Sequence, residues 1–197
     1  MNKAFLTAAA MSVLALSACK QSGTSISNNQ TQGMTDEAAI DNSALGGNMA
    51  DANMSGMATS ADQTYVQNAA ASDMFEIQTS QQALEKSTLP SIKTYAQMMI
   101  DEHGKSTAEL KTAAQAAGIT VPATLPAEQQ AKLQALTAKS GTAFDQQYLA
   151  DQRAGHQDTL AKVNGYIAAA PAGPLKDHAS KVTGVVQKHL NTLEKIK

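Results

Sequence analysis

Three histidines occupy positions at which the sequence otherwise repeats apolar or small residues at helical spacing. Residues seven apart lie on the same face of a helix. The three rows read Ala96, His103, Leu110, Ala117; then Leu149, His156, Val163; then Leu175, Val182, His189, Ile196. We therefore predict that the three histidines point into the interior of a helical domain.

A carboxylate is expected beside them. Glu76 falls in the row Ala69, Glu76, Ala83 and has Ile77 as an apolar neighbour. Each of the four polar residues lies near the middle of its own predicted helix. Because a helix rises only 1.5 Å per residue, a two-residue error in a helix end moves a side chain by about 3 Å. We expect the four side chains to meet in one layer half-way along a bundle.

Ring nitrogens and a carboxylate at one level are typical ligands of Zn, Cu or Fe. The predicted site is one transition metal ion held by Glu76, His103, His156 and His189. Asp101 and Glu102 precede His103, and both are expected to orient it by a hydrogen bond from outside the ligand set. The alternative is a metal-free hydrogen-bond network that fixes the register of the helices.

Several other kinds of site are excluded. A di-iron carboxylate site needs Glu three residues before the histidine on two helices, whereas Ile100, Arg153 and Val186 occupy those positions. The sequence contains no Ser/His/Asp arrangement, phosphate-binding glycine loop or dinucleotide fingerprint. The fourth histidine, His178, falls outside the inward row and is expected on the surface. Gly155, next to His156, either permits a close approach of helices or is simply tolerated within the helix.

The elements that must position these residues are helices. The expected helices span about 62–86, 90–117, 126–140, 142–169 and 174–196, and every proline lies between or at the start of these patterns. Asp62 is expected to cap the first helix, Pro90 and Pro174 suit first-turn positions, and Gly118 and Gly141 suit helix ends. No segment alternates as a strand does. The expected fold of residues 61–197 is all-α: an up-and-down four-helix bundle with an additional short helix.

The N-terminus is typical of a bacterial lipoprotein. Lys3 precedes an apolar run of residues 4–16 that is too short to span a bilayer, as in a secretory signal. Residues 16–19, Leu-Ser-Ala-Cys, resemble a lipobox, which makes residues 1–18 a signal peptide and Cys19 the lipidated first residue of the mature chain. Cys19 is the single cysteine and has no intramolecular disulfide partner. Lys20 after it resembles the pattern that favours sorting to the outer membrane.

Residues 19–60 are rich in Ser, Asn, Gln, Gly and Thr and are expected to form a flexible, disordered tether. Its methionines are soft ligands suited to Cu(I), although no His lies near them. The formal charge is −2, and removal of Lys3 with the signal leaves −2 − 1 = −3. A chain with this charge and no basic patch is not expected to bind nucleic acid.

Four segments carry a family resemblance: DQTYVQNAAASDMFEIQTSQQALEKS, IKTYAQMMIDEHGKSTAELK, FDQQYLADQRAGHQDTL and HLNTLEKI. Together they resemble the bacterial envelope domain-of-unknown-function family four-one-four-two, often labelled predicted outer membrane protein. The resemblance covers roughly residues 60–197 and implies a ferritin-like bundle in exported or lipid-anchored proteins. It places His103, His156 and His189 on the family's recurring histidines and Glu76 on its first-helix acid. Glu102 keeps the acid that often precedes the first histidine, whereas Gly155 departs from that pattern at the second.

These observations lead to a primary hypothesis and two alternatives. The first is a non-enzymatic, lipid-anchored, periplasm-facing protein whose bundle binds a partner or responds to envelope stress, with a metal ion in the histidine layer. The second is a metal-free structural or interaction protein with an envelope protein as its partner. A metal-dependent redox enzyme is the third, and it needs a substrate pocket and an open coordination position.

Overall fold

The structure, a computed structural model, describes residues 58–196, and these residues form five helices and no strand. The helices are α1 (Ser60–Lys86), α2 (Pro90–Ala116), α3 (Ala127–Thr137), α4 (Gly141–Ala169) and α5 (Pro174–Leu193). The expected all-α, ferritin-like bundle with an extra short helix is confirmed. The signal peptide 1–18, Cys19 and the tether up to residue 57 lie outside the described residues.

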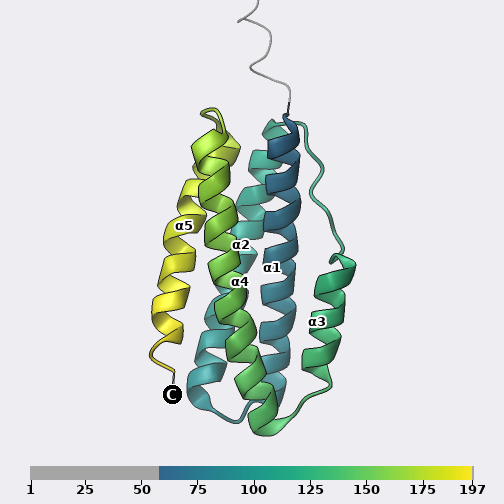
Figure 1. Cartoon of the computed structure of the whole chain (residues 1–197), viewed down its shortest axis with the longest axis vertical. Coiled ribbons are helices and arrows are strands. Elements are labelled where there is room, and N and C mark those ends of the chain that lie inside the picture. The colour runs from purple at the N-terminus through teal and green to yellow at the C-terminus, as the bar shows by residue number, and fades with distance from the viewer. Residues whose placement is uncertain (1–57, 197) are drawn as a thin grey trace, which may run out of the picture. The chain divides into compact units, whose positions relative to one another are not determined.

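The four long helices pack in a ring in which α1 contacts α2 and α4, and α5 contacts the same two helices. Residues 87–89 join α1 to its antiparallel neighbour α2, and residues 170–173 join α4 to α5. The connection between α2 and α4 contains α3, which packs on α1 and α4. Figure 1 shows that this connection returns along the bundle, so that α2 and α4 run in the same direction. One long crossover of this kind is typical of ferritin-like bundles, and it replaces the expected up-and-down order of the four long helices.

The helix ends follow local chemistry, with two corrections. Thr59, not Asp62, is the N-cap of α1: the Thr59 hydroxyl accepts from the Asp62 amide at 3.1 Å, and the Asp62 carboxylate accepts from the Thr59 amide at 2.9 Å. This reciprocal capping box satisfies two amides that a helix start leaves free. Gly141 is the first residue of α4 and not the end of α3, which stops at Thr137.

The other expected ends agree with the structure. Pro90 and Pro174 are the first residues of α2 and α5, where a missing amide hydrogen costs nothing. Gly118 has a φ of 68° directly after the C-cap of α2, in the left-handed region that favours glycine.

The core consists of two apolar clusters at opposite ends of the bundle, separated by buried polar side chains. One cluster contains Tyr65, Val66, Ala70, Leu110, Ala113, Ala114, Val163, Tyr166, Ala170, Leu175 and Ala179. The other contains Ala83, Ile92, Tyr95, Ala96, Met99, Leu136, Phe144, Tyr148 and Leu193. We call the polar side chains between them the histidine layer: Asp73, Glu76, His103, Gln152, His156 and His189, all buried.

Candidate metal centre

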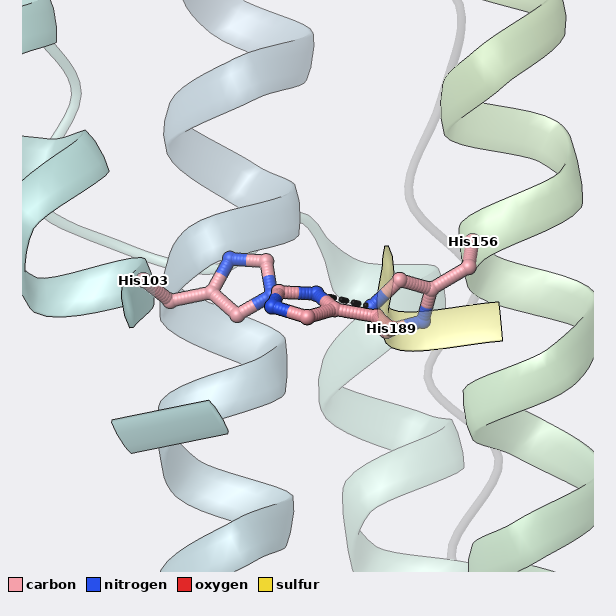
Figure 2. Close-up of side chains that lie close together, drawn as sticks. All are labelled: His103, His156 and His189. Atoms are coloured by element: carbon pink, nitrogen blue, oxygen red, sulfur yellow. Dashed lines mark hydrogen bonds between the residues drawn. The ribbon is translucent and has the colours of Figure 1, made fainter. Parts of the chain in front are cut away.

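The three predicted histidines meet in the middle of the bundle, one each from α2, α4 and α5. One ring nitrogen of each lies within 4.8 Å of those of the other two. Figure 2 shows the three rings converging, with His189 between His103 and His156. None of the three residues is more than 5% exposed. The heptad spacing therefore predicted both their inward direction and their common level.

Each ring is held by an acceptor on its outer nitrogen. His103 Nδ1 donates to Asp73 Oδ1 at 2.8 Å, and His156 Nδ1 donates to the Gln152 carbonyl at 2.6 Å. His189 Nε2 donates to Glu102 Oε2 at 2.8 Å. A carbonyl or carboxylate oxygen has no hydrogen to give, so in each pair the ring nitrogen must carry the proton.

These hydrogen bonds determine what the other nitrogens carry. In a neutral imidazole with one nitrogen protonated, the second nitrogen bears a lone pair. His156 Nε2 and His189 Nδ1, which lie 2.9 Å apart, therefore present lone pairs to each other. His103 Nε2 is buried and has no hydrogen-bond partner within residues 58–196. Three electron-pair donors thus face a space that offers them no hydrogen, an arrangement satisfied by a cation.

Burial keeps two of the rings neutral. It lowers the pKa of His156 to about 3 and that of His189 to about 4, and repulsion from the charge on His103 acts in the same direction. Burial also opposes a charge on His103, but the hydrogen bond and charge of Asp73 outweigh it and raise the His103 pKa. Of the three rings, His103 is therefore the one that accepts a second proton most readily.

Glu76 lies in the same layer, beside the outer side of His156. Its Oε1 is 3.8 Å from His156 Nδ1, and its Oε2 accepts from the Gln152 amide. Burial raises the pKa of the Glu76 carboxyl to about 7. Gln152 Oε1 has no partner among the described residues. Glu76 is therefore not directed at the inner nitrogens as the histidines are.

The position of Glu102 differs in detail from the expectation. Its carboxylate lies against His189 and Lys188, not against the adjacent His103. Burial alone would raise the pKa of the Glu102 carboxyl, but the hydrogen bonds from Lys188 and His189 have the larger effect, and the net pKa is lowered. Asp101 is exposed and accepts from Gln97. His103 is instead oriented by Asp73 of α1, which the sequence analysis did not single out.

The expectation that His178 lies on the surface is wrong: the residue is 4% exposed. Its Nε2 donates to the Ser106 carbonyl at 3.2 Å, so its Nδ1 accepts from the Tyr65 hydroxyl at 2.6 Å. Tyr65 stacks on Tyr166 with ring centroids 4.2 Å apart. The inward stripe of a helix includes residues three and four after each row position, and His178 is three residues after Leu175. Both ring nitrogens of His178 therefore have a hydrogen-bond partner.

Gly155 does lie at a close approach of helices. A Cβ on this residue would stand 3.0 Å from Glu76 Oε1. The absence of a side chain leaves the space that this oxygen faces.

Comparisons with known proteins agree with the fold. The sequence profile of the family described as "Domain of unknown function (DUF4142)" matches residues 47–196. No functionally curated protein matches the chain significantly. The solved structure of a DUF305 fragment from Deinococcus radiodurans is similar with a TM-score of 0.62 at 15% identity, over 70% of this chain and 95% of that one. At this identity the likeness concerns the fold alone.

Proposed function

The chain belongs to the DUF4142 family of unknown function, and we propose that its bundle is a metal-binding module that holds one transition metal ion on His103, His156 and His189. The observation that carries the proposal is the set of outer hydrogen bonds, which turns a lone pair of every ring inward. Metal-binding histidines characteristically donate their other N–H to a carboxylate or carbonyl. Asp73, Glu102 and the Gln152 carbonyl supply these acceptors.

The distances suit a small ion after modest side-chain movement. A tetrahedral ion with Zn–N bonds of 2.0–2.1 Å separates its nitrogens by about 3.3 Å. The observed separations, 2.9 Å for the closest pair and at most 4.8 Å for the others, bracket this value. Imidazole nitrogens suit Zn²⁺, Cu²⁺ and iron, and Cu²⁺ and Zn²⁺ generally bind a given site more tightly than Fe²⁺ does. Asp73 and Glu102 compensate part of the ionic charge without ligating it.

We propose that the module works in the cell envelope. Among residues 58–196 no helix is both long and apolar enough to cross a membrane, so attachment would depend on the lipobox at residues 16–19. Cys19 would carry the lipid, Lys20 would direct the chain to the outer membrane, and residues 20–57 would connect the anchor to the bundle in the periplasm. The chain would then bind the membrane through this lipid anchor.

Metal titration of the full-length protein, purified without a polyhistidine tag, tests the proposal. We expect one equivalent of Zn²⁺ or Cu²⁺ by elemental analysis, and a higher melting temperature with metal because a ligand of the native state stabilises it. His103→Gln, His156→Gln and His189→Gln should each lower affinity by more than the roughly 10- to 100-fold expected for losing an outer partner.

His178→Gln is the matched control, since His178 is as buried as the three histidines but lies outside the histidine layer and pairs with Tyr65. This variant should lose stability yet keep the affinity for metal. If Zn²⁺, Cu²⁺ and Fe²⁺ all fail to bind or to raise the melting temperature, the metal proposal is wrong and the layer is a hydrogen-bonded core.

A further inference from the structure

A cavity of about 1330 Å³ leads from the surface of the bundle to the histidine layer. Residues of all five helices line it. Asp73, Glu76 and His103 form part of its wall, whereas His156 and His189 do not. The cavity therefore reaches the layer beside His103.

The three ring nitrogens leave room for a fourth ligand of the metal ion on the His103 side of the layer. Three ring nitrogens converge, and zinc and copper sites with three protein ligands complete their coordination with water or substrate. His103 lines the cavity, and its inner nitrogen Nε2 is one of the layer's buried polar atoms with no hydrogen-bond partner in the described part of the chain. Gln152 Oε1 is the second such atom in the layer. A water or an ion can satisfy buried polar atoms of this kind.

Glu76 and Gly155 shape the space at the cavity end. The Gln152 amide fixes Glu76 Oε2, while Oε1 faces the space in which Gly155 has no side chain. Both residues line the cavity. A small molecule that enters this cavity would therefore pass a carboxyl oxygen able to accept a hydrogen bond.

We propose that the metal ion keeps one coordination position open to this cavity and binds an exchangeable, small monodentate oxygen or nitrogen donor there. Water or hydroxide would occupy the position at rest. This inference rests on the proposed three-histidine metal site. It distinguishes an accessible reactive centre from a closed structural one.

The test is a titration of the Cu²⁺-loaded full-length protein with azide, followed by the charge-transfer absorption of a copper–azide bond. We expect a saturable band with one azide per copper. Gly155→Ala should weaken azide binding about tenfold, because the added methyl group lies against Glu76 Oε1 and narrows the passage. The affinity for Cu²⁺ itself should not change, since none of the three histidines is altered.

Gly165→Ala is the matched control: it adds the same methyl group to the same helix, at a cavity-lining position with open space around it. It should bind azide like the wild type. Stoichiometric copper without any azide band would overturn the open position while leaving the metal proposal standing, and failure to bind copper or zinc at all would overturn both. Equal azide affinity in Gly155→Ala and the wild type would also overturn the inference, because the ligand would then not use this passage.

Discussion

At the scale of single residues, Asp73 is the strongest constraint on the histidine layer. One of its oxygens accepts from His103 Nδ1 at 2.8 Å and the other accepts from the Thr107 hydroxyl at 3.1 Å. The carboxylate thus fixes both the orientation of the ring and the nitrogen that carries its hydrogen.

Replacing Asp73 by Asn should weaken metal binding while preserving the fold. The amide retains one acceptor oxygen for His103 but loses the charge and places an NH₂ group where Thr107 donates. We expect the affinity for Zn²⁺ or Cu²⁺ to fall roughly 10- to 100-fold, as measured by competition with a chromophoric chelator. Asp101→Asn removes an exposed carboxylate of α2 and should leave the affinity unchanged. Equal affinities in the two variants would show that Asp73 does not position the ligand.

The sequence predicted the three converging histidines better than the residues that orient them. His103, His156 and His189 were found because each interrupts an apolar row of period seven. Asp73 and Gln152 were missed because each lies three or four residues from a row position, at Glu76 and His156. The same geometry explains the error on His178: an inward stripe is wider than one row. The angle between two helices determines which residues at the margins of their inward stripes pair with each other. The periodicity of the sequence gives no information about that angle.

At the scale of elements, α3 makes the crossover between two long helices that run in the same direction. It contributes a single buried residue, Leu136, to the core. Leu136→Ala should reduce the free energy of unfolding by about 2–5 kcal/mol, as for other large-to-small changes in a packed core. Urea denaturation followed by circular dichroism measures the loss.

Leu133→Ala is the control for this prediction, because Leu133 lies on the same short helix and is only partly buried. Leu133→Ala should reduce the free energy of unfolding by less than Leu136→Ala does. The loss would come mainly from the surface contact of the leucine, since Ala is itself a strong helix former. If both changes cost the same, α3 would be held by its connections and not by the packing of Leu136.

The start of α1 gives a pH-dependent prediction. Burial raises the pKa of Asp62, but hydrogen bonds from Tyr166 and Thr59 outweigh it and lower the pKa below its usual 3.8. A carboxyl whose folded pKa is depressed binds fewer protons folded than unfolded, so its stabilisation is present above pH 3.8 and is lost as pH falls through the lower folded value. Asp62→Asn should therefore cost about 1 kcal/mol at neutral pH and less at the acid end, in urea titrations at both pH values. If the wild type and Asp62→Asn differ in free energy of unfolding by the same amount at neutral and at acid pH, the ionised Asp62 carboxylate does not stabilise the start of α1.

At the scale of the whole molecule, the fold was more predictable than the site. Prolines at helix starts and the 3.6-residue periodicity determined the helices to within a few residues at each end. The crossover through α3 follows from packing between helices and has no local signature. Likewise, the division of the core into two apolar clusters around one polar layer appears only once the four long helices are aligned in space.

The attachment of this bundle to a membrane is a prediction about the whole chain, and it depends on one residue that precedes the described part. Acyl chains on Cys19 would each contribute about 0.8 kcal/mol per buried CH₂, and more than one chain is needed for long-lived anchoring. We expect the wild-type protein to incorporate labelled palmitate and to sediment with membranes, whereas Cys19→Ala should take up no label and leave the membrane fraction. Lys20→Asp is the matched control, which should keep the label but move the protein from outer to inner membranes on a density gradient. A Cys19→Ala variant that still sediments with membranes, together with an unlabelled wild type, would show that the chain is not a lipoprotein.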